Sequence, residues 1–165
     1  VVGLLISLGA RAQRSEIDTD AVRTLHTGFF ESLRQGGADG VLAHLRQTGA
    51  LDTRDIRALE PRLRALEAAF GRPDAYSLVS EWEVPGSSRL RIGLFLTYHE
   101  AGPAGWRLRF YRRVTGVWAI AAVQFETGFV EDFVRLGEVE FSAYRAVLDR
   151  LPTKPELERM LKESR

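Results

Sequence analysis

The stretch from residue 75 to residue 126 constrains the fold most, because apolar and polar side chains alternate along four consecutive segments. Alternation with a period of two is typical of strands that bury one face. Short turns such as PGSS and AGPAG separate these segments, so consecutive strands are expected to pair antiparallel. The sequence therefore predicts a meander with strands over residues 75–84, 89–100, 106–113 and 117–126.

Helical spacing governs the residues on either side of this meander. A first helix is predicted over about 18–35 and a second over about 38–48, with a pair of glycines between them. A third helix begins near Asp52, and Pro61 is expected to split it, because proline breaks helix interiors. Helical spacing returns beyond Gly128. The predicted fold class is α+β, with N-terminal helices packed on a curved antiparallel sheet of about four strands and a C-terminal helical segment.

The composition indicates a chain that folds around its own hydrophobic core. Its 165 residues suffice for one domain, and 45% of them are hydrophobic while 27% are charged. The absence of cysteine excludes thiolate zinc sites, thiol nucleophiles and disulfides. The 23 basic residues balance 22 acidic ones, whereas nucleic-acid binders normally carry a basic excess. No nucleic-acid partner is therefore expected.

The N-terminal residues VVGLLISLGARAQ combine an apolar run with the small-x-small pattern of a secretory cleavage site. Residues 1–12 are interpreted as the remnant of a signal peptide, and the alternative is a buried first strand or helix. The run is too short to span a bilayer, which needs about 20 apolar residues. The predicted organisation is a single α+β domain over 13–150 and a charged helical tail over 151–165. The protein is predicted to be exported, to the periplasm or the extracellular space.

Sorting the first three predicted strands by parity separates an apolar face from a charged one. Even positions are strongly apolar and are expected to lie under the helices. The odd positions carry three arginines that form a candidate patch for an anionic ligand, Arg91, Arg107 and Arg109. The alternative is a solvated sheet face on which Glu81 and Glu83 balance these charges.

The fourth predicted strand is apolar on both faces. One of its faces carries a row that is unusual on an exposed surface, Val117, Ala119, Ala121, Val123 and Phe125. Two covers are considered for this row: the helical segment after Gly128, or the same face of a second copy in a homodimer. The homodimer is the slightly favoured expectation.

Helices followed by a meander whose last strand begins GVWAIAAVQFE resemble the nuclear transport factor 2-like superfamily, over roughly residues 18–126. The resemblance implies a cone-shaped α+β roll like that of ketosteroid isomerases and polyketide cyclases. Those enzymes use an acid or a histidine that faces the cone interior. Here no carboxylate lies at the positions of the central strands that are predicted to face the interior. Gln124 and Glu126 lie where cyclase-like members often have a histidine. Both departures count against catalysis.

The candidate ligand site is a set of large or polar side chains on the predicted interior face. They are Tyr76, Trp82, Tyr98, Trp106, Trp118 and Gln124. These residues line a small apolar pocket at the cone mouth in one interpretation, and form plain core in the other. The three histidines are His26, His44 and His99, and none has metal-ligand spacing, so neither a metal nor a cofactor is expected.

The resulting functional hypothesis is an exported, non-catalytic domain that binds a small apolar ligand or a protein partner. A cone-pocket enzyme of the isomerase or cyclase type is one alternative. A dimeric assembly module is the other.

Overall fold

The computed structural model describes residues 2–49, 51–128, 130–135, 137 and 142, with side chains from residue 18 onward. Helices α1 (Val2–Thr48) and α2 (Thr53–Phe70) precede a sheet of β1 (Ala75–Glu83), β2 (Leu90–His99), β3 (Gly102–Arg112) and β4 (Trp118–Glu126). The strands pair antiparallel in the order β1-β2-β3-β4. The predicted α+β class and the four-stranded meander are confirmed. The predicted tail over 151–165 lies outside the described residues.

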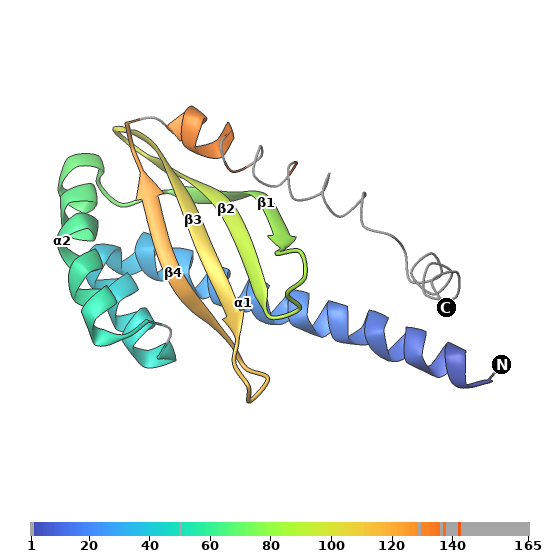
Figure 1. Cartoon of the computed structure of the whole chain (residues 1–165). Coiled ribbons are helices and arrows are strands. Elements are labelled where there is room, and N and C mark those ends of the chain that lie inside the picture. The colour runs from blue at the N-terminus through green and yellow to red at the C-terminus, as the bar shows by residue number, and fades with distance from the viewer. Residues whose placement is uncertain (1, 50, 129, 136, 138–141, 143–165) are drawn as a thin grey trace, which may run out of the picture.

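The helices cover one side of the sheet (Figure 1). Helix α1 crosses behind the strands, and α2 lies alongside β4 at the edge of the sheet. A short helical stretch follows β4 and includes residues 130–135. The side that faces α1 is called the helix side below, and the opposite side is called the outer side.

A kink at Gly37 divides α1 where the sequence predicts a break between two helices. Gly37 adopts a φ of 59°, which favours glycine. The backbone N–H of Ala38 donates to the Glu67 carboxylate of α2 at 2.8 Å, in place of an intrahelical partner. Arg72 in turn donates to Glu67 at 3.1 Å. One carboxylate thus caps the second half of α1 and joins it to α2.

The expected split of the third helix at Pro61 is wrong. Helix α2 continues through the proline, although an interior proline costs about 3 kcal/mol. Asp52 caps its start by accepting from the N–H of Asp55 at 2.8 Å. A buried apolar stripe continues on both sides of the proline and fixes the helix against the core: Ile56, Leu59, Leu63 and Leu66. Packing of this stripe therefore overrides the local preference for a break.

The pairing of β2 with β3 contradicts the predicted faces of the sheet. Phe95 pairs with Trp106, so odd positions of β2 share a face with even positions of β3. The helix side consequently carries Phe95 together with Trp106, Leu108 and Phe110. Even positions of β2, such as Leu94, point to the outer side instead. The expectation that even positions of the first three strands share one face is wrong, because the alternation within each strand does not determine how neighbouring strands are aligned.

Two bulges change the faces again. The register of β1 shifts between Leu78 and Ser80, so Tyr76 lies on the helix side while Trp82 lies on the outer side. In β4, Ile120 pairs with Phe110 and Ala122 pairs with Arg109, which leaves Ala121 as the extra residue. Bulges of this kind reverse the alternation of all residues that follow.

The predicted apolar row on β4 is therefore not a single surface. Val123 and Phe125 pack against the helix-side core. Ala119 pairs with Tyr111 on the outer side, and Val117 lies in the turn before β4 with 60% of its surface exposed. The row cannot serve as one homodimer face, because its members point in different directions.

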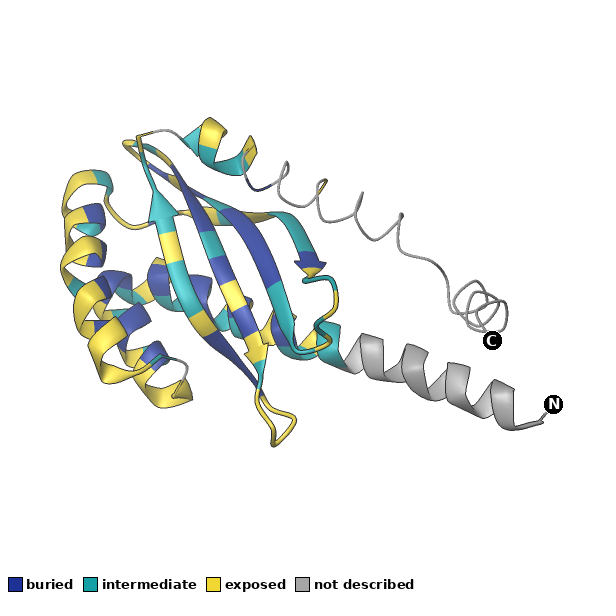
Figure 2. Cartoon of the chain, in the orientation of Figure 1, coloured by how far each residue is buried: buried dark blue, intermediate teal, exposed yellow. Residues whose placement is uncertain are grey.

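The buried residues form a large cluster on the helix side and a small one on the outer side (Figure 2). The outer cluster consists of Trp82, Ile92 and Leu94, with Phe133 packed against it. Phe133 belongs to the helical segment after Gly128 and also lies against Gly105, where an added Cβ would be 3.0 Å from its ring. Of the two covers considered, the C-terminal segment therefore contacts the outer face.

We expect Trp106→Ala to lower the free energy of unfolding by about 3–5 kcal/mol, because it empties a fully buried site among aromatic rings. Arg109→Ala, an exposed position on the same strand, is the matched control and should cost less than about 1 kcal/mol. Urea unfolding of both variants measures the difference. Similar losses in the two variants would contradict the assignment of faces.

Gly36→Ala and Gly37→Ala form a second matched pair. The Cβ of an alanine at position 37 would lie 2.0 Å from a carboxylate oxygen of Glu67, and the alanine backbone would have to adopt a positive φ. We therefore expect Gly37→Ala to lower the free energy of unfolding by about 1–3 kcal/mol. At Gly36 a Cβ meets nothing within 4 Å, and the higher helix propensity of alanine should stabilise the protein by about 1 kcal/mol. Thermal unfolding of the two variants checks the opposite signs.

Candidate functional site

The space between the helices and the sheet is filled by aromatic rings. The ring of Phe30 stacks on Tyr76 with centroids 4.6 Å apart, and it meets Phe95 at 4.9 Å. Phe29 packs edge-on against Trp106 at 5.7 Å. All these rings except that of Tyr76 are almost fully buried. Two of the six predicted pocket residues, Tyr76 and Trp106, are thereby accounted for as core packing.

The structure does not bring the other four predicted pocket residues together. Trp82 belongs to the outer cluster, and Tyr98 lies on the outer side with 42% of its surface exposed. Trp118 sits at the start of β4, where its indole N–H donates to Asp18 at 2.9 Å. Gln124 is exposed and pairs with Arg107. The expectation that these side chains share one wall is wrong, because the two bulges and the β2–β3 register distribute them over both sides.

A buried chain of hydrogen bonds links the sheet to the end of α2. The indole N–H of Trp106 donates to the hydroxyl of Thr97 at 2.7 Å. Thr97 lies 2.8 Å from Nε2 of His99, and Nδ1 of His99 lies 2.8 Å from the carbonyl of Gly71. A carbonyl only accepts, so Nδ1 carries the proton and Nε2 accepts from Thr97. Each polar group in this series has a hydrogen-bond partner, which indicates that the series of hydrogen bonds has a structural role.

A layer of ion pairs joins the N-terminal half of α1 to the sheet. Arg91 contacts Glu81 at 3.3 Å and donates to Thr19 of α1 at 3.1 Å. Arg112 contacts Asp18 at 2.8 Å. The predicted arginine patch for an anionic ligand is therefore divided. Arg91 lies on the helix side within this layer, whereas Arg107 and Arg109 point to the outer side.

Glu81 corrects the expectation that no carboxylate faces the helices. The bulge in β1 places it on the helix side opposite Gly93, with only 12% of its side chain exposed. Burial raises the pKa of Glu81, and the nearby guanidinium groups of Arg91 and Arg23 partly oppose this shift. The pairing with Arg91 engages the carboxylate in holding α1 on the sheet.

His26 of α1 is another titratable group on the helix side. Its ring is surrounded by aromatic side chains, 4.9 Å from Phe95 and 6.4 Å from Tyr76 between centroids. Burial lowers the pKa of His26 to about 4, with a smaller contribution from the charge of Arg23. It is therefore a neutral packing residue near pH 7. Within the described residues, no group of three or more histidine, aspartate or glutamate side chains can hold a metal ion.

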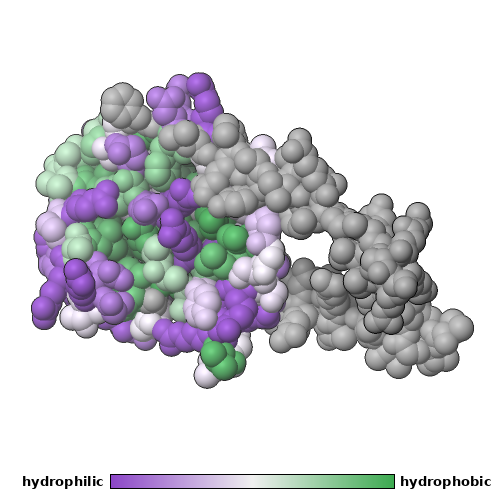
Figure 3. Space-filling view, in the orientation of Figure 1, coloured by the Kyte–Doolittle hydropathy of each residue, from purple (hydrophilic) through white to green (hydrophobic). Residues whose placement is uncertain are grey.

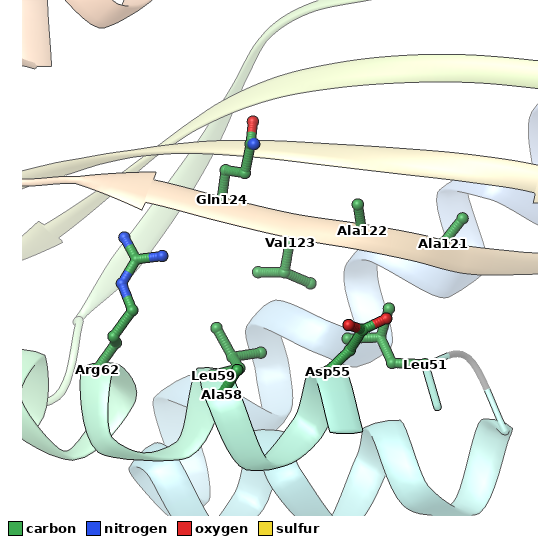
Figure 4. Close-up of a pocket in the computed structure, with 9 residues that line it drawn as sticks. All are labelled: Leu51, Asp55, Ala58, Leu59, Arg62, Ala121, Ala122, Val123 and Gln124. Carbon is green, nitrogen blue, oxygen red and sulfur yellow. The ribbon is translucent and has the colours of Figure 1, made fainter. Parts of the chain in front are cut away.

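An open groove lies between α2 and β4 (Figure 4). Its volume is about 240 Å³, and its lining combines aliphatic side chains with polar and charged ones. The lining residues are Leu51, Asp55, Ala58, Leu59, Arg62, Ala121, Ala122, Val123 and Gln124. The side chain of Val123 points toward α2, whereas that of Gln124 points away from it. We call this space the α2–β4 groove.

The α2–β4 groove carries opposite charges at two positions along α2. Asp55 lies beside the alanines of β4, and Arg62 lies toward the end of the strand. The Arg62 guanidinium donates to the carbonyl of Phe125 at 3.2 Å and lies 4.8 Å above the centre of its ring. Both charged side chains belong to exposed residues. The groove therefore presents aliphatic side chains together with a negative charge at Asp55 and a positive charge at Arg62.

A second, shallower space lies on the outer side between β2 and the helical stretch after β4. It has a volume of about 280 Å³ and is lined by Leu96, Val130, Glu131, Val134 and Arg135. On the face shown in Figure 3, hydrophilic and apolar side chains of the described residues are mixed.

Little in the sequence indicates the α2–β4 groove. Ala121 and Val123 belong to the row that was predicted to form a dimer surface, and Ala58 lies on the exposed side of a helix. Arg62 and Phe125 meet although 63 positions separate them along the chain. The one available signal was the run of small residues in β4, which indicates close approach of another element without identifying it.

No family model, curated protein or solved structure matches this chain. Among the described helices, none combines the length and the apolar character needed to cross a membrane.

The lowered pKa of His26 predicts a pH dependence of stability. The folded state binds the proton more weakly than the unfolded state, so the stabilisation is present above about pH 6.5 and is lost as the pH falls toward about 4. The shift corresponds to at most about 3 kcal/mol. As the pH falls from 7 to 4, we expect the free energy of unfolding of His26→Phe to rise by about this amount relative to that of the wild type. Parallel pH profiles of the unfolding free energy would contradict the burial of a neutral imidazole.

Proposed function

We propose that this chain is a non-catalytic binding domain that takes a partner protein in the α2–β4 groove. The proposal rests on where the structure leaves open space and where side chains fill it. Aromatic side chains fill the region between the helices and the sheet, while the groove offers an aliphatic surface between α2 and β4. We also propose that the domain is exported and has the nuclear transport factor 2-like fold, supported by the apolar residues 1–12 and by the order of helices before the meander.

A protein partner fits the α2–β4 groove better than a small apolar ligand does. Small-molecule sites usually enclose most of the ligand surface. This groove has two walls, and the free edge of a sheet runs along one of them. Interfaces between proteins use such open surfaces, with an apolar centre and charged residues near the rim. Asp55 and Arg62 provide the charged positions here.

A cone-pocket enzyme is the second candidate, and one observation favours it. Glu81 and His26 both lie on the helix side, where a catalytic acid or base is expected in such enzymes. Glu81 is nevertheless paired with Arg91, and His26 packs among aromatic rings. Catalysis would require both groups to leave these contacts, so the binding function is preferred.

Photo-crosslinking from α2 tests the binding function. We expect benzoylphenylalanine at Ala58, on the wall of the α2–β4 groove, to form a discrete adduct with another protein in the producing cell. The same residue at Ala65, which is also exposed on α2 but does not line the groove, is the matched control. The adduct should disappear when Ala121 on the opposite wall is changed to arginine. Equal crosslinking from both positions, or none from Ala58, would refute the proposed function.

A further inference from the structure

We propose that the partner binds as an additional strand on the free edge of β4, where Arg62 occupies the position of a peptide N–H in the unbound protein. This inference rests on the proposed function and specifies how the α2–β4 groove recognises its partner. The partner is an extended segment with aliphatic residues at alternate positions, an acidic residue near Arg62 and a basic residue near Asp55.

The backbone of β4 offers the hydrogen-bonding groups that strand addition needs. Strand β4 is the last in the sheet, and among the described strands it pairs only with β3. The carbonyl of Phe125 accepts from Arg62 on α2, which shows that it points away from β3. Residues of an antiparallel strand alternate between bonding the neighbour and facing away from it, so the backbone groups of Val123 face the same edge as those of Phe125. A free edge of this kind is a template for another strand.

Arg62 satisfies this edge in a way that a peptide can replace. Its guanidinium donates one hydrogen bond to Phe125 and lies over the ring, but the residue is exposed. A peptide N–H that bonds to the Phe125 carbonyl would release the guanidinium at the rim of the groove. The released group can then form a bidentate pair with a carboxylate of the incoming segment. Arg62 therefore both protects the empty edge and selects an acidic residue.

The walls of the groove define the remaining side chains of the partner. An added strand directs every second side chain to one face, here toward α2. Ala58 and Ala121 are small, so the space beside Leu59 and Val123 accommodates aliphatic side chains in a volume of about 240 Å³. Asp55 lies farther along the groove than Arg62 and favours a basic residue there. Main-chain bonds give affinity in this mode, and the alternate pockets give specificity.

Two synthetic peptides test the strand addition directly. Both are blocked at their ends and alternate valine with threonine, and they carry lysine and glutamate at opposite ends in the two possible orders. We expect one order to bind at least about tenfold more tightly than the other, because the other order places like charges beside both Asp55 and Arg62. Amide NMR should show that the bound peptide slows hydrogen exchange at Val123 and Phe125 but leaves Gln124, which already faces β3, unchanged.

N-methylation provides the signature of backbone pairing. Methyl groups on the alternate peptide nitrogens that face β4 should abolish binding, whereas methyl groups on the intervening nitrogens should leave it unchanged. The double variant D55K/R62E should prefer the opposite charge order. Arg57→Glu, an exposed change on α2 outside the groove lining, is the matched control and should keep the wild-type preference.

The outcomes separate this inference from the proposed function. If neither peptide protects the β4 amides at millimolar concentration, or if both methylation patterns are equivalent, strand addition is refuted. A crosslink from Ala58 in that case would leave the binding function in place with another mode of docking. If the peptides pair with β4 but Ala58 yields no crosslink in cells, the edge is competent for pairing and the proposed function fails.

Discussion

The hydrogen bond from the Trp106 indole to the Thr97 hydroxyl is the contact on which the arrangement of the domain depends. It joins β3 to β2 in the buried interior, and Thr97 extends the connection through His99 to the carbonyl of Gly71. Gly71 ends α2, so the same chain of hydrogen bonds fixes where that helix stands relative to the sheet. The C-terminal end of α2 is therefore connected to the buried interior of the sheet. An unsatisfied member would cost about 1–3 kcal/mol, which makes the chain sensitive to any change in register.

Helix α1 is attached by two different kinds of interaction along its length. Its C-terminal half contributes apolar residues to the main core, including Val41 and Leu45, and Glu67 caps that half at the kink. The part around Asp18 is held by ion pairs and hydrogen bonds to Arg112 and Trp118. Apolar burial is stronger and independent of charge, whereas ion pairs depend on pH and salt. The attachment near Asp18 therefore depends more strongly on salt concentration than the apolar packing does.

The bulges in β1 and β4 decide what each side of the sheet can do. The bulge in β1 moves Glu81 to the helix side and Trp82 to the outer side. The bulge at Ala121 turns Val123 toward α2 and directs Gln124 away from it. The result is a filled interior and an aliphatic groove at one edge. Open space therefore remains at the edge of the sheet in the α2–β4 groove, while aromatic side chains fill the region between the helices and the sheet.

The sequence by itself determined the elements, because periods of 3.6 and 2 follow from local backbone geometry. It predicted the four strands, the glycine break before Ala38 and the start of a helix near Asp52. Tertiary structure alone decided the continuity of α2 through Pro61, the faces of the strands and the α2–β4 groove. The alternation within a strand is local, but the pairing of Phe95 with Trp106 and the extra residue at Ala121 depend on how separate strands pack. Arg62 and Phe125 lie 63 positions apart, so only folding brings the two walls of the groove together.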